Sequence, residues 1–510
     1  MKTVKIAMML LAALAMVSCS DFLELKHESN ISADDFNRTE DELYTSLVGC
    51  YNGMQGALYR EWAMTELRSD NTRIYARTSS TSIFDVIRQL DLSTIQPINY
   101  LVDEYWAGNY HNIERCNTVL RDYAVVGDEV LRNQYRVEAM FIRAYHYFYF
   151  NLVRLFGGVF LVTEPVTAQE ARYMQRSNPD LIYDRIIADL REIVDNAMLP
   201  DTREGDELGR ITMPAAKALL AKVYMTHYAV GTEEYAKARP LLEEVIATVG
   251  NPQTAADLVP YADIFDINNE MNREIIFAVR YKAGNLGLGS PFGNEFAPAN
   301  SGTNVINGSG RSYNYPSTSI IDAFNAEPGD LRKDVSMAEK YYNQQTDTWV
   351  DDDETTQCRY VKKYLSPVET VDDGESDWPV IRVGDVLLLY AEIVNELEGP
   401  TPEAVNCVNM IRERAGLQPL SSEKTANSYL FRTAIRNERR LELAFENQRW
   451  FDLLRWGIAV DLIGEHYRQE FIYSNLPNDY QPTIVEWQTL LPIPLNVMNI
   501  NPELTQNYGY

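Results

Sequence analysis

The densest cluster of charged side chains in the sequence lies at residues 436–449, RNERRLELAFENQR. Glu438, Glu442 and Glu446 recur there at every fourth position, which places three carboxylates on one face of a helix. Such carboxylates can act as general acid and base, but glycosidic hydrolysis requires a pair across a cleft, about 5 to 9.5 Å apart. Four arginines share the stretch, at Arg436, Arg439, Arg440 and Arg449. Opposite charges at helical spacing favour ion pairs that lock helices together over acid–base catalysis.

Other sequence patterns give little indication of catalysis or metal binding. The sequence contains no GxSxG elbow, no HExxH and no Walker loop, and Gly287-Leu-Gly289 lacks the third glycine of a dinucleotide loop. The acidic run Asp351–Glu354 lacks the alternating ligands and the glycine of a calcium loop, so a solvated acidic loop is the favoured interpretation. The five histidines lie far apart and read as surface or packing residues. We therefore predict no metal and no cofactor.

Aromatic side chains in polar segments without helical periodicity suggest a binding surface. Tyr75 lies in DNTRIYAR at residues 70–77, and Tyr100 follows Pro97-Ile-Asn99. An exposed ring can cover the apolar C–H face of a sugar while Asn, Asp and Arg side chains bond its hydroxyl rim. The alternative is that these rings only pin loops to the scaffold, and residue types alone leave both readings open. The other loop aromatics are Tyr281, Phe292, Phe296, Tyr313, Tyr315, Trp349 and Trp378.

Composition and charge exclude several classes of protein. The 510 residues are 45% hydrophobic and 23% charged, which is ordinary for a globular chain. Acidic residues outnumber basic ones 73 to 46, for a net charge of −27. Binding to nucleic acid or to anionic lipid through charge requires the opposite balance. The 32 tyrosines suit flat, amphipathic contact surfaces.

The amino terminus has the pattern of a lipoprotein signal peptide over residues 1–18. Lys2 and Lys5 precede an apolar run at residues 6–17, which is too short to span a bilayer. Cys19 follows a small residue directly after this run, as in a bacterial lipobox, and we expect it to be lipidated. Removal of the two lysines makes the mature chain −29. An ordinary secretory leader with an incidental cysteine is the alternative.

The elements that must position these residues are mostly helices. Apolar residues recur at helical spacing along most of the chain, and a short strand is indicated at 274–280. Several helices are joined by short turns, which indicates stacked helical hairpins resembling tetratricopeptide repeats. The remaining cysteines, Cys50, Cys116, Cys358 and Cys407, fall on predicted helices as small buried residues. The predicted helices are 40–59, 102–123, 128–156, 180–198, 213–229, 233–249, 382–397, 402–415, 427–446 and 447–463.

A central segment departs from the helical pattern. Residues 284–312 hold seven of the 26 glycines and no apolar period, and long insertions of this kind in compact domains are usually functional or disordered. We expect an all-α-dominated chain with few short strands, comprising a lipidated tether at 19–40 and one domain at 41–510. Within it, the parts are a helical part at 41–280, a loop-rich excursion at 281–380 and a second helical part at 381–510.

Motifs spread along nearly the whole mature chain resemble those of the RagB/SusD family of outer-membrane lipoproteins. The most specific is FIRAYHYFYFNLVRLFGGV at 141–159, which continues to TEP at 163–165 and resembles the family's long helix and turn. The other similar blocks are CSDFLE at 19–24, GRITMPAAKALLAKVY at 209–224, PVIR with DVLLLYAE at 379–392, IRERAG at 411–416, IRNERRLELAFE with RWFDLLRWG at 435–457, and LPIP with NPELTQN at 491–507.

The resemblance implies a SusD-like helical scaffold with four tetratricopeptide-like units and no enzymatic activity. It implies a protein anchored in the outer membrane and facing the cell exterior. There it would capture oligosaccharide or polysaccharide and deliver it to a SusC-like TonB-dependent β-barrel transporter. Some family members capture peptides instead, and a glycoside hydrolase is a further alternative. The resemblance does not identify the sugar.

Position within the family suggests where the ligand binds. Family sites use aromatic and polar residues near the segment that leads into the helix at 102–123, and in the large central loops. Carried over to this sequence, the candidate ligand-binding residues are Arg73, Tyr75, Asn99, Tyr100, Trp106, Phe292, Asn294, Tyr313, Tyr315 and Trp349.

Overall fold

The structure is a computed structural model that describes most of the mature chain. The predicted signal peptide, Cys19 and most of the predicted tether lie outside the described residues, as does Tyr75. The described residues are 36–74, 82–149, 151–196, 199–228, 232–299, 301–308, 310–353, 356, 358–471 and 482–510.

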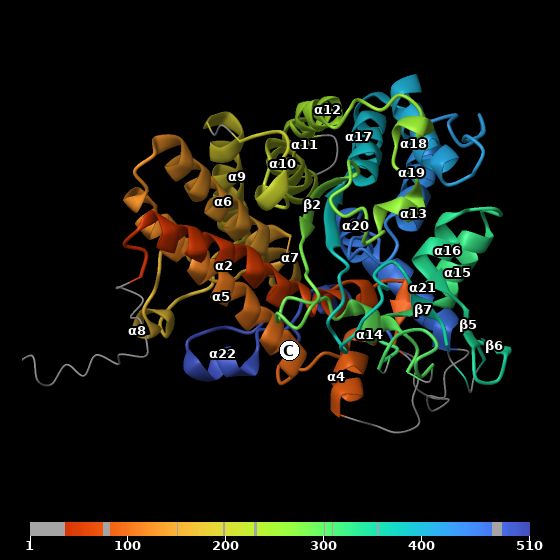
Figure 1. Cartoon of the computed structure of the whole chain (residues 1–510), viewed down its shortest axis with the longest axis horizontal. Helices are drawn as coiled ribbons and strands as arrows, with labels where there is room; N and C mark the ends of the chain where they lie inside the picture. The colour runs from red at the N-terminus through yellow and green to blue at the C-terminus, as the bar shows by residue number, and fades with distance from the viewer. Residues whose placement is uncertain are drawn as a thin grey trace, which may run out of the picture.

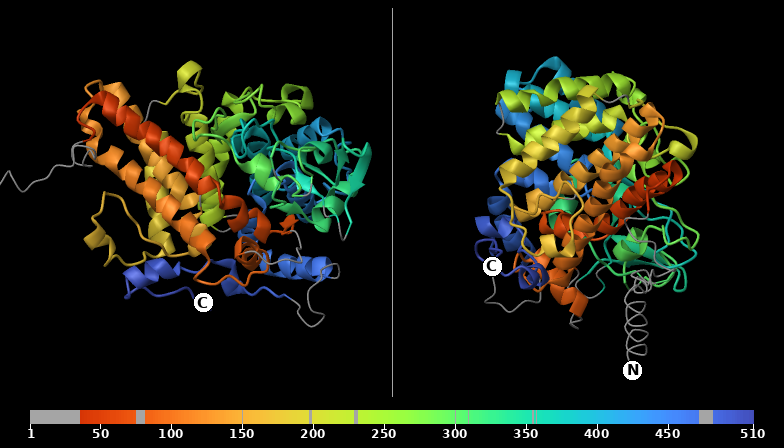
Figure 2. Two further views of the ribbon diagram at one scale, coloured as in Figure 1. Left: turned by 60° about the horizontal axis from the view of Figure 1, so that its bottom comes forward. Right: turned by 90° about the vertical axis from the view of Figure 1, so that its left-hand side faces the viewer.

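The N-terminal part is a row of helices that pack side by side in chain order, as the left view of Figure 2 shows for the red and orange helices. Most begin where the sequence supplies a capping side chain: Thr39, Asn99, Asp128 and Thr212 each accept a hydrogen bond from a backbone N–H in the first turn. The row consists of α2 (Glu40–Leu58), α5 (Tyr100–Asp122), α6 (Glu129–Phe148), α9 (Pro179–Asn196), α10 (Met213–His227), α11 (Glu233–Ala236) and α12 (Ala238–Thr248).

The C-terminal part continues the row, because α12 packs against α17 (Figure 1). One hydrophobic cluster runs through both parts, from Leu43 to Leu504. The predicted stack of helical hairpins is therefore confirmed. The main helices of this part are α17 (Val383–Glu398), α18 (Pro402–Arg414), α19 (Ser428–Glu442), α20 (Arg449–Arg455), α21 (Ala459–Phe471) and α22 (Leu495–Ile500).

Three predicted helices are split in the structure and a fourth ends early. The helix predicted at 233–249 forms α11 and α12, and the one predicted at 447–463 forms α20 and α21, with the left-handed Gly457 (φ 68°) between them. The helix predicted at 128–156 ends at Phe148, and α7 (Leu152–Phe156) starts after Asn151, whose left-handed backbone (φ 64°) interrupts the helix. The side-chain amide of Asn151 donates to Glu61 over 2.9 Å. The helix predicted at 427–446 ends at Glu442, and Phe445 in the following turn is also left-handed (φ 67°). Apolar periodicity continues through the turns at Asn151 and Phe445, which is why it does not reveal them.

The excursion at 281–380 contains short elements connected by loops. The predicted strand at 274–280 is β2 (Ile275–Val279), which pairs antiparallel with β8 (Trp378–Arg382). The other two-stranded pairs are β1 (Thr72–Arg73) with β3 (Tyr315–Pro316), β4 (Met337–Ala338) with β7 (Tyr360–Val361), and β5 (Lys340–Asn343) with β6 (Thr348–Asp351). The short helices there are α14 (Phe292–Phe296), α15 (Thr318–Asn325) and α16 (Arg332–Ser336).

Buried ion pairs tie the excursion to α19, and the predicted structural role of the three glutamates is confirmed. Glu438 and Glu442 lie on α19 and both form ion pairs with Arg332 of α16, at 2.6 and 3.2 Å. Arg382, the last residue of β8, bonds both Glu442 and Glu446. Glu446 lies in the turn after α19 and also accepts from Lys363 of the excursion at 2.6 Å. These carboxylates are buried in the cluster.

The partners of these glutamates differ from the sequence expectation. Arg439 pairs instead with Asp385 and Asp452, while Arg440 and Arg449 both pair with Asp70. Glu438, Glu442 and Glu446 are bound by cations from distant segments, namely Arg332, Lys363, Arg382, Arg412 and Arg414. The cluster therefore joins elements far apart in sequence rather than bracing one helix.

The four cysteines of the described chain are unpaired and buried, as predicted. Cys358 differs from the prediction in position, because it lies beside the β5–β6 hairpin rather than on a helix. Across the described residues, no helix combines the length and the apolar character that a membrane crossing requires.

Candidate functional site

The N-terminal end of α5 brings an exposed ring next to charged side chains from the excursion. Tyr100 is the first residue of α5 and is 37% exposed. Asn99 fixes its position: the Asn99 carbonyl oxygen of the side chain caps Leu101 N–H at 3.1 Å, and its amide donates to α4 (Ser82–Asp91) at Val86, 2.9 Å away. Tyr100 is therefore held by a cap that also ties α4 to α5.

Arg60 lies beside Tyr100, just after the end of α2. Its guanidinium carbon sits 4.0 Å from the centre of the Tyr59 ring, and its Nε donates to Glu104 of α5 at 3.3 Å. A second guanidinium nitrogen lies 3.6 Å from Glu295 of α14. Partial burial raises the pKa of the Tyr100 hydroxyl. Arg60 opposes this shift and Glu104 adds to it. The hydroxyl is therefore a neutral hydrogen-bonding group.

The excursion contributes a second arginine–carboxylate pair. Arg311 donates two hydrogen bonds to Asp372, each of 2.6 Å. Asn294 joins the two segments, because its side-chain oxygen accepts from Asp372 N–H at 3.0 Å and its backbone oxygen accepts from Arg311 N–H at 3.0 Å. Arg311 acts electrostatically on both Tyr59 and Glu295, which places it beside the Arg60 cluster.

A layer of buried rings supports this surface from below. Tyr313 stacks on Trp62 with ring centres 5.6 Å apart, and Phe84 of α4 meets Tyr313 edge-on (Figure 1 shows α4 beside α14). Glu295 is buried among these rings and accepts from the Trp62 indole at 3.0 Å. Burial raises the pKa of Glu295 to about 7, against the opposing pull of Arg60. The support is thus packed and hydrogen-bonded.

We call this surface the Tyr100 site and define it as Tyr59, Arg60, Tyr100, Glu104, Arg311 and Asp372. Three parts of the chain meet there: the end of α2, the start of α5 and the excursion. A half-exposed ring flanked by guanidinium and carboxylate groups can cover an apolar face and bond hydroxyl groups around it. Its pairs are internally neutral, so the site suits a polar, uncharged ligand better than a strongly charged one.

Five of the predicted binding residues lie inside the protein instead of on a loop surface. Asn99 and Asn294 are fully buried, and structural contacts use both polar atoms of each side chain; the Asn294 amide donates to the Asn307 carbonyl at 3.0 Å. Trp106 packs edge-on against Phe156 in the helical core, and Phe292 packs 4.6 Å from Trp378. Tyr313 is the buried support under Tyr100. For these residues the alternative reading applies, because their rings and amides pin loops to the scaffold.

Arg73 and Tyr315 come together on neighbouring strands but are committed to structural contacts. They are paired residues of β1 and β3. The Arg73 guanidinium bonds Glu470 of α21 at 2.8 Å. The Tyr315 hydroxyl donates to Asp352, a residue of the acidic run, which also accepts from Cys358 N–H and Arg359. Asp352 therefore serves as a hydrogen-bonding anchor for the loop. No group of three or more potential metal ligands occurs among the residues that the structure describes.

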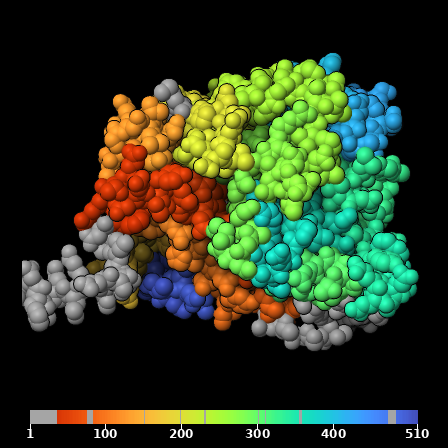
Figure 3. Space-filling model, in the orientation of Figure 1, coloured from red at the N-terminus to blue at the C-terminus, as the bar shows by residue number. Residues whose placement is uncertain are grey.

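Trp349 is the other predicted residue with an exposed ring. It lies on β6 of the β5–β6 hairpin and is 57% exposed. Tyr342 of β5 meets it edge-on at 5.5 Å, and the Lys340 ammonium sits 5.0 Å from its ring centre. In Figure 3 the excursion forms the green and cyan part of the surface, beside the orange N-terminal segment. The hairpin thus offers a separate exposed aromatic pair.

Sequence reasoning identified one residue of the Tyr100 site and missed the others. Tyr59 is the last residue of the helix predicted at 40–59, Glu104 falls within the helix predicted at 102–123, and Arg60 has no predicted role. Arg311 and Asp372 lie in the excursion without a local pattern. The sequence feature that could have identified Arg60 is its position directly after a predicted helix, because binding residues often lie on the loops that follow helices.

Fold and site together define a protein in which stacked helical hairpins support loops with an aromatic and polar surface. A family model described as "SusD family" matches residues 329–510, and one described as "Starch-binding associating with outer membrane" matches residues 21–225. The chain belongs to the SusD family, as the sequence resemblance indicated.

Relatives of known name or structure agree over nearly the full length. "SusD-like protein P25" of Formosa agariphila is 25% identical, over 97% of each chain, and "SusD-like protein P2" of the same organism is 26% identical, over 99% of this chain and 98% of that one. A solved "Laminarin binding SusD-like protein" is similar with a TM-score of 0.73 and 25% identity, over 92% of this chain and all of that one. "Surface glycan-binding protein A from Bacteroides thetaiotaomicron in complex with laminarihexaose", at 19% identity and a TM-score of 0.73, shares the fold over 92% of this chain and 99% of that one.

Proposed function

We propose that this protein is a non-catalytic lipoprotein that captures a glycan at the Tyr100 site. The observation that carries the proposal is the exposed Tyr100 ring beside Arg60, in a charge cluster that the Arg311–Asp372 pair joins through Tyr59 and Glu295, above a packed aromatic support. A rigid support limits the conformational entropy that ligand binding costs. A solved relative that is named for binding laminarin supports the choice of a glycan.

Capture without catalysis fits the placement of the carboxylates. Glu438 and Glu442, the acidic residues with the most suggestive spacing, are buried and bonded to several guanidinium groups. Arg414 and Arg382 hold the pKa of Glu442 far below its usual range, so it is a poor general acid or base near neutral pH. In the proposed function, Glu438 and Glu442 stabilise the fold and take no part in catalysis.

Delivery to a transporter completes the proposal. A millimolar site corresponds to only about −4 kcal/mol, but a lipid anchor at Cys19 would hold the protein beside a SusC-like TonB-dependent β-barrel transporter. Tethering raises the effective concentration of captured ligand at the pore. The matching family model, described as associating with the outer membrane, supports this location.

The test is calorimetry and native affinity electrophoresis across a panel of neutral and acidic polysaccharides that includes laminarin. Tyr100→Ala should weaken binding of the recognised glycan by about tenfold or more, or about 1.4 kcal/mol, and Tyr100→Phe should keep most of the affinity because the ring remains. Trp349→Ala tests whether the hairpin belongs to the same ligand path. Tyr429→Ala is the matched control, since Tyr429 is also an exposed tyrosine in the first turn of a helix capped by asparagine.

Two outcomes would redirect the assignment. Binding of peptides, with no binding of any glycan on the panel, would identify a peptide-capturing relative instead. Release of sugar products from a polysaccharide, with loss of release in Glu438→Gln or Glu442→Gln, would identify a glycoside hydrolase. Glycan binding that is equally strong in Tyr100→Ala and in the Tyr429→Ala control would move the site away from Tyr100.

A further inference from the structure

A second candidate site lies on the helical part, in a pocket of about 680 Å³ formed by α5, α6, α9 and the segment at 163–165. This volume lies in the usual range for ligand pockets, about 300 to 1,000 Å³. No residue of the Tyr100 site takes part in it. The lining residues that carry charge are Arg121 of α5, Arg136 and Arg143 of α6, Arg185 of α9 and Glu164.

The charge of this lining is opposite to that of the protein. Four arginines and a single carboxylate face the pocket, although acidic residues outnumber basic ones 73 to 46 in the whole chain. The arginines come from three different helices, so the accumulation is not a local run of sequence. Leu120, Met140, Pro165 and the Tyr123 ring supply apolar surface between the guanidinium groups. The pocket thus combines cationic donors with flat apolar contacts.

The carboxylates that pair with these arginines stand outside the lining. Asp189 accepts from both Arg143 and Arg185, and Glu192 accepts from Arg136 at 2.9 Å. Neither acid is among the residues that line the pocket. Arg143 is buried and fully bonded, since it also donates to Asn117 and to the Thr163 carbonyl at 2.9 Å. The guanidinium groups therefore form the inner surface while their negative partners lie behind them.

Arg185 has unused donor capacity at this surface. One of its terminal nitrogens bonds Asp189, and its side chain remains 37% exposed, so the other terminal N–H groups can reach a ligand in the pocket. Its Nε is shielded from solvent and takes no part in this contact. Arg143 also pairs with Asp189, so two guanidinium groups share the single negative charge of this carboxylate. These features favour an anionic ligand group next to Arg185.

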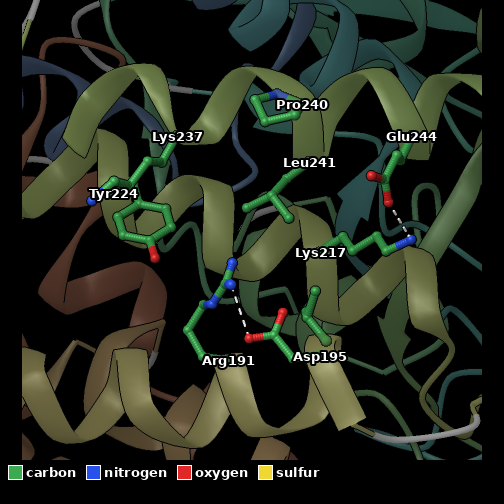
Figure 4. Close-up of a pocket in the computed structure, with 9 residues that line it drawn as sticks. Arg191, Asp195, Lys217, Tyr224, Lys237, Pro240, Leu241 and Glu244 are labelled. Carbon is green, nitrogen blue, oxygen red and sulfur yellow. Dashed lines mark ion pairs between the residues drawn. The ribbon is translucent and has the colours of Figure 1, made fainter. Parts of the chain in front are cut away.

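The neighbouring pocket, shown in Figure 4, provides a contrast. It has a volume of about 740 Å³ and lies between α9, α10 and α12. Its Arg191–Asp195 pair (2.9 Å) and its Lys217–Glu244 pair have both members on the lining. The carboxylates there are exposed to any ligand alongside the cations. In the α5–α6–α9 pocket, by contrast, Glu164 is the one carboxylate on the lining, and the acids that pair with Arg136, Arg143 and Arg185 are not part of it.

The overall negative charge does not cancel this local effect. At physiological ionic strength, charges are screened over about 8 Å, so an anion inside the pocket interacts mainly with the arginines around it. The −27 net charge acts at longer range and disfavours indiscriminate adsorption of polyanions. Selection for an anion would then depend on the four guanidinium groups.

The geometry points to the α5–α6–α9 pocket as a binding site for a sugar residue that bears a carboxylate or a sulfate group. The choice of a sugar rests on the proposed glycan capture, and the site itself is distinct from the Tyr100 site. The anionic group would bond Arg185 and Arg136, and the apolar face of the ring would lie on Met140 and Pro165. The protein would thereby hold an acidic glycan at two places.

The experiment uses the mature protein with Tyr100→Ala, so that the first site is weakened. Calorimetric titration with a tetragalacturonate should show binding that declines as ionic strength rises, whereas a neutral tetrasaccharide should not bind. Arg136→Gln with Arg185→Gln should lower the affinity by about tenfold or more, because each removes a charge-assisted contact. Arg191→Gln should leave it unchanged. Arg191 is the matched control because it also lies on α9 and forms an i,i+4 pair with an aspartate.

Thermal melting of each variant verifies that the fold is retained, which is expected because Arg143 still pairs with Asp189. Equal binding of tetragalacturonate by the double variant and by Arg191→Gln would overturn the inference. Arginine-dependent binding to phosphatidylglycerol vesicles, without binding of tetragalacturonate, would also overturn it by assigning the pocket to a lipid phosphate. If the pocket binds tetragalacturonate but no glycan depends on Tyr100, the proposed Tyr100 site fails and this inference stands.

Discussion

Glu61 shows how strongly burial acts on a single side chain in this protein. It lies at the start of α3 (Glu61–Met64), is fully buried and accepts a hydrogen bond from Asn151 at 2.9 Å. Desolvation raises its pKa from 4.5 to about 8, although Arg154 and the amide of Asn151 oppose the shift. The folded protein therefore holds a proton on Glu61 that the unfolded chain releases near pH 4.5. Four other carboxyls have a pKa raised to about 7, namely Glu66, Asp91, Glu295 and Asp377.

This proton makes stability fall as pH rises. Between pH 4.5 and about 8 the native state binds more protons than the unfolded state, so each such group lowers the free energy of unfolding by about 1.4 kcal/mol per pH unit within its window. Glu61→Gln should reduce the slope of stability against pH from 4.5 to 8, measured by urea unfolding at a series of pH values. Glu244→Gln, a change at an exposed carboxylate, should keep the wild-type slope. An unchanged slope in Glu61→Gln would contradict the assignment.

Among single residues, the loop aromatics fall into an exposed group and a buried group, and residue type does not predict which ring belongs to which. Tyr100 and Trp349 expose their rings, whereas Tyr313, Tyr315 and Phe292 are almost entirely buried. All five were predicted from the same feature, a ring in a polar segment without periodicity. Which ring faces outward depends on what packs against it, and Trp62 and Trp378 come from other parts of the chain.

Among the elements, β8 and α19 carry the contacts that hold the excursion to the scaffold. Arg382 ends β8 and bonds Glu274, Glu442 and Glu446, all of them buried. Ion pairs of this kind often add little compared with an apolar core, but the loss of one member leaves an uncompensated buried charge. The position of the excursion, and with it Arg311 and Asp372 of the Tyr100 site, depends on this cluster.

Arg382→Met should lower the free energy of unfolding by about 3 to 5 kcal/mol, because Glu442 and Glu446 lose their shared cation. Urea unfolding at pH 7 measures the effect. Arg432→Met is the control: Arg432 pairs with Glu396 on the same helical part but is one-third exposed, so its loss should cost at most about 1 kcal/mol. Equal losses in the two variants would show that the buried cluster contributes no more than a surface pair.

Elements were predicted best where local sequence controls them. The starts of α6 and α10 were predicted to within one residue, and α10 has a proline in its first turn, whereas α5 begins at Tyr100, two residues before its predicted start. The breaks at Asn151 and Phe445 were missed, because apolar residues continue across them at helical spacing. Asn151 adopts its left-handed conformation next to Glu61 of a distant segment, a contact that has no local signature.

In the whole molecule, the row of helices forms a single support with one continuous hydrophobic cluster. The function proposed for the protein requires that this molecule be attached to a membrane. Cys19→Ala should release the protein from membrane fractions, because the predicted lipid anchor is the means of attachment. Fractionation followed by immunoblotting measures this, with Cys50→Ala as the control cysteine variant. Continued attachment of Cys19→Ala would contradict the anchor. The wild-type protein should co-purify with a β-barrel transporter in mild detergent, and its isolation as a free monomer would count against delivery to one.

The sequence by itself determined the helical class, the order of the helical hairpins and the burial of the cysteines, and it favoured a structural use of the three glutamates without identifying their partners. The first three follow from apolar periodicity, which acts over a few residues, whereas the glutamates pair with cations from distant segments. Only the tertiary structure decided that Arg60 would lie beside Tyr100 with Arg311 in the same charge cluster, which loop rings would be exposed, and that four arginines would line one pocket. Those outcomes depend on contacts between segments tens to hundreds of residues apart, and local sequence carries no record of such contacts.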